Sequence, residues 1–240
     1  MTNAPTIIRN NRYYFQDGSD IFQVENQLFK VHRFFLQRYS SVFRDILSQT
    51  QPHSTGTTGV KGTSDANPIR IPQVTTYEFE TLMDSFYFTT LYDEASLLVT
   101  TPAGCFALLR VTHRFKIISD KMQELAIDAL NRCQPPVDDV ELLAVAAKCN
   151  VQIAYLIPAL ERLATRSSSL TGEEMERLPK DMLPKICKAR EEIYKQRICQ
   201  AQSVEVPSSP QKIVHEVFGV PCISFPSFKF VFSPTWAVKQ

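Results

Sequence analysis

The residue types that could carry chemistry are spread thinly along this chain. Its histidines lie far apart, at His32, His53, His113 and His215. No His-Glu-x-x-His or Cys-x-x-Cys motif occurs, and a zinc site would need ligands from unrelated segments. A Gly-x-Ser-x-Gly elbow, a Walker loop and a Gly-x-Gly-x-x-Gly motif are also absent. The sequence therefore predicts no catalytic, cofactor-binding or metal-binding residues.

The remaining ionisable groups have simpler explanations than catalysis. The pairs Asp138-Asp139 and Glu173-Glu174 stand at expected helix starts, where the helix dipole favours negative charge. His113 lies within the apolar stretch 106–115, and no second ligand or nucleophile has a matching spacing. We interpret it as a hydrogen-bonded imidazole in the core or at its edge.

Composition bounds the class of protein. Lys and Arg number 26 against 25 Asp and Glu, so no basic field indicates direct binding to nucleic acid or to a membrane surface. No apolar run approaches the ~18 residues of a membrane span. The start Met-Thr-Asn-Ala-Pro does not resemble a signal peptide, and the six cysteines are scattered. We expect reduced thiols in an intracellular protein, cytoplasmic or nuclear, with no contact to membrane.

The elements that would position any site begin with two short strands. Residues 20–31 contain two runs in which apolar and polar side chains alternate, the pattern of half-buried strands. Asn26-Gln27 between them predicts a tight turn. In residues 35–47 the apolar spacing changes to three and four, which predicts helices, and Ser40 or Ser41 can cap the second one.

Further helices follow, and two of them begin with a capping box. Thr75-x-x-Glu78 and Thr171-x-x-Glu174 each let a hydroxyl and a carboxylate satisfy the first free amides of a helix. Residues 69–71 predict another short strand. Residues 13–15 could add a strand ahead of the hairpin, or they could be a frayed terminus.

Two segments do not fit the helical pattern. Residues 48–68 are rich in Gly, Ser and Thr and predict a mobile loop, because no Gly-Lys-Ser/Thr phosphate motif follows their glycines. Residues 201–240 are rich in Pro and Phe. Within them, residues 225–232 are rich in aromatic side chains, and residues 228–232 alternate as a strand would; we expect this segment to dock on the domain or on a partner.

The order of hairpin and helical pair resembles the opening of a BTB/POZ domain. The matching residues are Asp20, Phe22, Val24, Phe29, His32, Arg33, Leu36, Ser40 and Phe43. Residues 109–130 are similar to the last two helices of BTB/POZ domains in fungal proteins. Residues 138–192 are similar to the helical extension that those fungal proteins carry.

The resemblance implies an α+β fold, with a short three-stranded sheet flanked by about five helices and followed by an α-helical extension. The expected organisation is an N-terminal segment over residues 1–16, a BTB/POZ-like domain over 17–133, a helical extension over 134–200 and the C-terminal tail over 201–240. The mobile loop 48–68 would lie inside the domain.

The resemblance also implies protein partners, by homodimerisation or by association with other proteins, including a role as adaptor for a cullin-type ubiquitin ligase. Asp20 and Arg33 match a pair of buried charges near the family's dimer interface, and Phe34 and Phe35 follow directly. The alternative is that Asp20 and Arg33 cap a strand end and a helix start within one monomer. Structural roles are expected for Phe22, Val24, Phe29, His32, Leu36, Ser40 and Phe43.

Other functions remain open at this point. A transcription-associated scaffold without catalysis fits the same residues. An enzyme or ligand-binding protein on the same helical frame would show a concave pocket with convergent polar groups. A scaffold would instead expose an apolar patch of roughly a few hundred Å².

Overall fold

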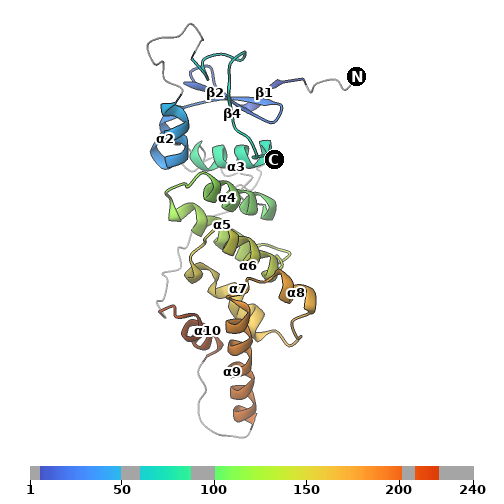
Figure 1. Cartoon of the computed structure of the whole chain (residues 1–240). Coiled ribbons are helices and arrows are strands. Elements are labelled where there is room, and N and C mark those ends of the chain that lie inside the picture. The colour runs from blue at the N-terminus through green and yellow to red at the C-terminus, as the bar shows by residue number, and fades with distance from the viewer. Residues whose placement is uncertain (1–5, 50–59, 88–100, 202–208, 222–240) are drawn as a thin grey trace, which may run out of the picture.

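A computed structural model of the protein describes residues 6–49, 60–87, 101–201 and 209–221. In chain order, the elements are β1 (Ile8–Tyr14), β2 (Asp20–Val24), β3 (Gln27–Val31), α1 (Arg33–Tyr39), α2 (Ser41–Ser48), β4 (Ile69–Arg70), α3 (Thr76–Tyr87), α4 (Pro102–Arg114), α5 (Asp120–Arg132), α6 (Asp139–Lys148), α7 (Ile153–Thr165), α8 (Gly172–Arg177), α9 (Leu183–Ala201) and α10 (Pro210–Phe218). They follow one another along an elongated body, with the sheet at one end and α9 at the other (Figure 1). The predicted α+β class is confirmed.

The sheet is mixed, with strand order β1-β3-β2-β4. β2 and β3 form the predicted antiparallel hairpin, while β1 joins β3 and β4 joins β2 in parallel. The described residues thus form four strands in place of the expected three. The added strand is β1, whose register is interrupted where Asn10 Oδ1 accepts from the backbone N–H groups of Arg12 (3.0 Å) and Tyr13 (2.9 Å). A strand was one of the two alternatives for residues 13–15, but β1 begins earlier, at Ile8; because residues 9–12 are polar, apolar alternation does not indicate its start.

The hairpin turn lies one residue earlier than predicted. Val24 pairs with Gln27, so the turn is Glu25-Asn26, and Glu25 has a φ of 51°. The Glu25 carboxylate accepts a hydrogen bond from the backbone N–H of Thr76 (2.8 Å), the first residue of α3. This tertiary bond favours an unusual backbone conformation that a non-glycine residue seldom adopts.

The first helical pair closes over one face of the sheet. Ser40 separates α1 from α2; its Oγ accepts from the backbone N–H of Phe43 (3.0 Å) and donates to the carbonyl of Phe115 (2.5 Å). The ring of Phe43 stacks on that of Phe115, with centroids 4.4 Å apart. The residues expected to be structural are buried, with the exception of the partly exposed His32: Phe22, Val24, Phe29, Leu36, Ser40 and Phe43.

The segment before β4 differs from the expected mobile loop. Residues 50–59 lie outside the described residues, but Gly62 donates from its backbone N–H to Asn67 and accepts from Ile21 (2.7 and 2.8 Å). Asp65 is bonded by Arg9 and by the hydroxyl of Tyr14. Residues 60–68 therefore form a hydrogen-bonded turn against the sheet.

Helices α3, α4 and α5 pack in sequence and connect the sheet to the remaining helices. α3 begins with the predicted capping box: Thr75 Oγ1 accepts from Glu78 N–H (3.2 Å), and the Glu78 carboxylate accepts from Thr75 N–H (3.1 Å). α4 is buried on most of its surface because α3, α5 and α6 all contact it. The apolar composition of residues 106–115 follows from this central position.

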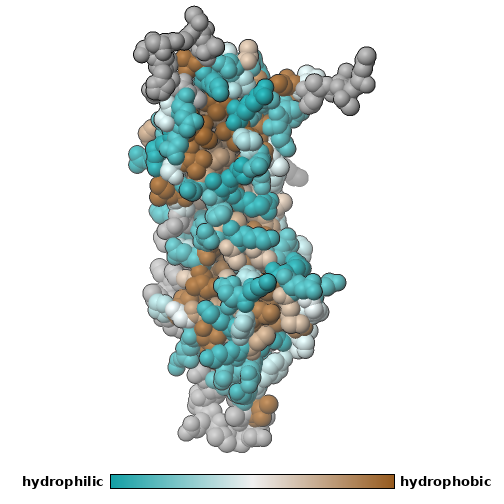
Figure 2. Space-filling view, viewed as in Figure 1, coloured by the Kyte–Doolittle hydropathy of each residue, from teal (hydrophilic) through white to brown (hydrophobic). Residues whose placement is uncertain are grey.

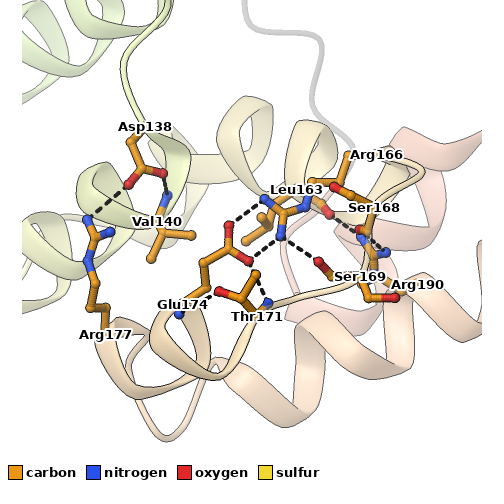
Figure 3. A network of polar contacts seen from close by, with 10 residues as sticks. All are labelled: Asp138, Val140, Leu163, Arg166, Ser168, Ser169, Thr171, Glu174, Arg177 and Arg190. Carbon is orange, nitrogen blue, oxygen red and sulfur yellow. Dashed lines mark hydrogen bonds and ion pairs between the residues drawn. The ribbon is translucent and has the colours of Figure 1, made fainter.

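The helices after α5 continue the same core. The buried apolar residues from Tyr13 to Phe218 form a single cluster, and α6 and α7 contact α4 and α5. α8 begins with the second predicted capping box, Thr171 with Glu174. Since α8 has no buried residue, polar contacts hold it: Arg177 bonds Asp138 (2.9 Å), and Arg166 bonds Glu174 (Figure 3).

Part of the expected tail is a helix. α10 is capped by Ser209, has Pro210 in its first turn and ends at Gly219, whose φ is 69°. It buries Ile213, Val214 and Phe218, and it packs against α7 and α9. The aromatic stretch 225–232 lies outside the described residues. No described helix is long and apolar enough to cross a membrane.

Candidate interaction surface

An ion pair joins the sheet to the start of α1. Asp20, the first residue of β2, pairs with Val31 at the end of β3, which brings it beside Arg33. Arg33 Nε donates to Asp20 Oδ2 (2.9 Å), and Nη2 donates to Oδ1 (2.6 Å). The Asp20 side chain is 2% exposed and that of Arg33 is 32% exposed. The hydrogen bond to Asp20 raises the pKa of Arg33. The two charges therefore fix the direction of α1 within one chain.

The two predicted interface phenylalanines face different surroundings. Phe35 packs into the domain, against Phe86 (ring centroids 6.1 Å apart) and Tyr87 (5.0 Å). Phe34 is 61% exposed, and the Arg38 guanidinium lies 5.7 Å from its ring centroid. Of this pair, Phe34 is the one that α1 presents to solvent.

A second exposed apolar side chain stands at the other end of α1. Ile118 is 67% exposed, and its backbone N–H donates to the carbonyl of Tyr39, the last residue of α1 (2.8 Å). α1 has seven residues and is therefore about 10 Å long. We call Phe34, Arg38 and Ile118 the α1 face. It contains the two most exposed large apolar side chains among the described residues.

Next to the α1 face, α2 borders a shallow apolar hollow of about 370 Å³. Its lining residues are Val42, Ile46, Ile71, Pro72, Arg114 and Phe115. Figure 2 shows apolar surface gathered beside α2 near the sheet end of the molecule. Arg114 closes one side of the hollow by donating to the Pro72 carbonyl (2.9 Å). This lining is apolar apart from Arg114, so the hollow suits contact with protein and offers no convergent polar groups for a reaction.

A buried polar cluster behind β1 was not predicted from the sequence. Asp84 of α3 is fully buried and receives hydrogen bonds from Arg12 (2.7 Å) and from the Tyr13 hydroxyl. Burial and the hydrogen bond to Asp84 raise the pKa of Tyr13, so its hydroxyl remains a donor. The sequence feature that could have revealed this cluster is Asp84, a single carboxylate on the otherwise apolar face of α3. The cluster ties β1 to α3, and its members satisfy one another.

The three histidines that the structure describes, His32, His113 and His215, do not assemble into a reactive site. His113 is exposed at the end of α4, and its Nε2 lies 3.4 Å from Asn150 Nδ2. His32 lies between Tyr87 (2.9 Å) and Asp17 (3.3 Å), and His215 contacts the carbonyl of Val220 (3.2 Å). Within the described ranges, no group of three or more His, Cys, Asp or Glu residues could hold a metal ion.

Comparison with protein families matches residues 16–124 to the BTB/POZ domain. The chain contains a BTB/POZ domain. Comparison with curated proteins gives no match. BTB/POZ domains are protein–protein interaction modules that mediate partnership and dimerisation, and they are typically not catalytic. The match includes the whole hairpin, helices α1 to α4 and the start of α5.

Within the BTB/POZ domain, the predicted residues divide into two sets. The set expected to be structural is buried in the core except for His32, which is partly exposed. The predicted interface set occupies the sheet–α1 junction, where Asp20 and Arg33 bind each other and Phe34 faces solvent. Ile118 was not singled out from the sequence. An apolar residue between two helices gives no indication of its exposure until the helices are placed.

Proposed function

We propose that this protein is an interaction scaffold without catalysis, and that its BTB/POZ domain self-associates through the α1 face. The observation that supports the proposal most directly is the exposure of Phe34 and Ile118 at the two ends of one short, rigidly held helix. Large aromatic side chains at the centre of an interface contribute most of the binding energy. Exposed apolar side chains that cluster mark protein contacts more often than scattered ones do.

A contact between two copies of α1 is self-complementary. In a two-fold dimer the same patch on each copy faces the other, so Phe34 of one copy can pack beside Ile118 of the second. Arg38 would lie at the rim, where its guanidinium can remain hydrated. The Asp20–Arg33 pair contributes indirectly, because it holds the first turn of α1 against the sheet.

The experiment compares two exposed apolar residues at opposite ends of the molecule. Phe34 is 61% exposed on α1, and Ile198 is 59% exposed on α9. Phe34→Ser should weaken the dimer at least about tenfold, measured by light scattering and sedimentation over a concentration series. Ile198→Ser serves as the matched control and should leave the dimer unchanged. Equal effects of the two substitutions, or a wild-type protein that is monomeric at all concentrations, would refute the proposal.

Asp20→Asn gives a second test of the same interface. Loss of the charge releases the Arg33 side chain and loosens the first turn of α1, so self-association should weaken while the domain stays folded. A folded Asp20→Asn variant with an unchanged dissociation constant would limit the ion pair to a role within the monomer, which is the alternative that the sequence left open.

A second candidate function is an adaptor for a cullin-type ubiquitin ligase. The observation that favours it is the continuous core that joins the BTB/POZ domain to α6–α10. Because this core holds the two parts together, a ligase subunit and another protein could both bind along the surface of one body. The test is binding of purified chain to purified cullin N-terminal domains by calorimetry, with Ile118→Asp as the variant. Absence of heat with every cullin would leave the scaffold role, including one associated with transcription, as the better candidate.

A further inference from the structure

The last turn of α7 is bound by side chains from α9. Arg190 Nη1 donates to the carbonyl of Leu163 (2.6 Å), and its Nη2 donates to the carbonyl of Ser168 (2.8 Å). The Tyr194 hydroxyl donates to the carbonyl of Ser167 (3.3 Å). Figure 3 shows the Arg190 guanidinium lying against the turn that leaves α7. The turn is therefore held through its backbone, while its side chains are left out of these bonds.

Arg190 carries a buried charge without an acidic partner. The residue is 9% exposed, and among the described residues no carboxylate lies within 4 Å of its guanidinium. The carbonyl end of α7 compensates the charge in part, because a helix C-terminus is the negative end of its dipole. The bonds to Leu163 and Ser168 use two N–H groups of Arg190, and a guanidinium has five N–H donors in all.

Three exposed serines, Ser167, Ser168 and Ser169, form the turn beside this charge. In the described part of the chain their hydroxyls have no hydrogen-bond partner, whereas all three carbonyls are bonded. Covalent geometry keeps a serine Oγ within about 5 Å of its own carbonyl oxygen. The Ser168 hydroxyl therefore lies within about 8 Å of Arg190 Nη2, on a residue that is exposed to solvent.

We propose that Ser168 is a phosphorylation site and that Arg190 binds the phosphate. A protein kinase would transfer the γ-phosphoryl group of ATP: a bond forms between Ser168 Oγ and phosphorus, the bond to the β-phosphate oxygen breaks, and ADP leaves. The hydroxyl proton passes to the catalytic base of the kinase. The product carries close to two negative charges and three acceptor oxygens, which match the unused donors of Arg190.

The neighbouring serines are less suited to this role. The Ser169 carbonyl accepts from Arg166 (3.2 Å), but that guanidinium already binds the Glu174 carboxylate, which would repel a phosphate. The Ser167 carbonyl is bonded to Tyr194, a neutral group. Ser168 is the serine of the turn that is bonded to an arginine without a carboxylate partner.

The modification would add a bond between α7 and α9. A phosphate on Ser168 bound by Arg190 joins the turn after α7 to the middle of α9, through a charge-assisted contact in a partly buried place. The phosphorylated protein should therefore be more resistant to unfolding than the unmodified one. This effect concerns the helices after the BTB/POZ domain and does not depend on self-association through the α1 face.

The first experiment places phosphoserine at position 168 of the full chain by genetic encoding. Ser64, exposed in the turn beside Asp65, supplies the matched control position. Phosphoserine at 168 should raise Tm by about 3–8 °C, and its phosphate should titrate at lower pH than the control in ³¹P NMR. Both effects should disappear with Arg190→Gln. If that variant does not fold, the ³¹P comparison between positions 168 and 64 decides alone. Equal titration at the two positions would overturn the proposal.

The second experiment tests whether kinases reach the site. The purified chain is incubated with a eukaryotic cell extract and Mg-ATP, and the phosphorylated residues are mapped by mass spectrometry beside a Ser168→Ala control. Phosphate at Ser168 supports the assignment. Phosphate confined to Ser167 or Ser169, or none on this turn while other positions are modified, contradicts it.

Discussion

Breaking the Asp20–Arg33 pair from each side should have unequal costs. The Asp20 carboxylate is 2% exposed, whereas the Arg33 side chain is 32% exposed. Arg33→Gln leaves a buried carboxylate without its cation, which should cost about 3–4 kcal/mol of unfolding free energy. Asp20→Asn leaves a guanidinium that can turn toward water, so the cost should be nearer 2 kcal/mol. The double variant should lose less than the sum, with a coupling of about 1–2 kcal/mol.

Urea unfolding followed by circular dichroism, with extrapolation to zero denaturant, measures the four proteins of this cycle. The exposed Arg132–Asp128 pair, with side chains 53% and 56% exposed, provides the control cycle. Its coupling should be below about 0.5 kcal/mol because water screens both charges. Additive costs at Asp20 and Arg33, or a larger loss from Asp20→Asn than from Arg33→Gln, would show that burial of the carboxylate does not govern the pair.

Three further predictions follow from single contacts. Ser40→Ala should lower the free energy of unfolding in urea by about 2 kcal/mol, because α2 loses its cap and the carbonyl of Phe115 loses its donor. The control Ser41→Ala should change it by less than about 0.5 kcal/mol. Gly62→Ala should lower Tm, since φ is +86° and an added Cβ would lie 2.7 Å from a methyl group of β4; Gly172→Ala, which meets nothing within 4 Å, should not lower it. The hydrogen bond from Arg166 lowers the pKa of Glu174 to about 2, from an ordinary value of 4.5. The bond between Arg166 and Glu174 therefore adds about 1 kcal/mol to the free energy of unfolding above pH 4.5, and this stabilisation is lost as pH falls through about 2. Melting curves of wild type and Glu174→Gln should converge over that interval, and a constant gap between them would contradict the assignment.

The hairpin shows how far the local pattern could be read. Alternation in residues 20–31 predicted both strands, but the turn is Glu25-Asn26 and not Asn26-Gln27. Asparagine tolerates positive φ better than glutamate does, so local preference pointed to the wrong pair. The deciding contact is the hydrogen bond that Glu25 accepts from the start of α3, far away in sequence.

Burial of polar groups was the least predictable part of the structure. β1 has few apolar residues and forms because it pairs with β3 and because Tyr13 and Arg12 bind the buried Asp84. The second unexpected element is α10, which lies within the segment 201–240 that the sequence marked as rich in Pro and Phe. Its cap at Ser209 was readable, but the face that it buries depends on where α7 and α9 lie.

The order of residues along the chain was enough to establish the class of fold, the hairpin, the two capping boxes and the resemblance to the BTB/POZ domain. These features depend on side chains only a few positions apart, whose preferences are local. Only the tertiary arrangement decided that Phe34 is exposed while Phe35 is partly buried, that Ile118 stands beside α1, and that Arg190 bonds a serine turn with no carboxylate of the described residues within 4 Å of its guanidinium. The exposure of a side chain and its pairing with another side chain depend on how the elements pack against one another, which the spacing of residues along one element does not specify.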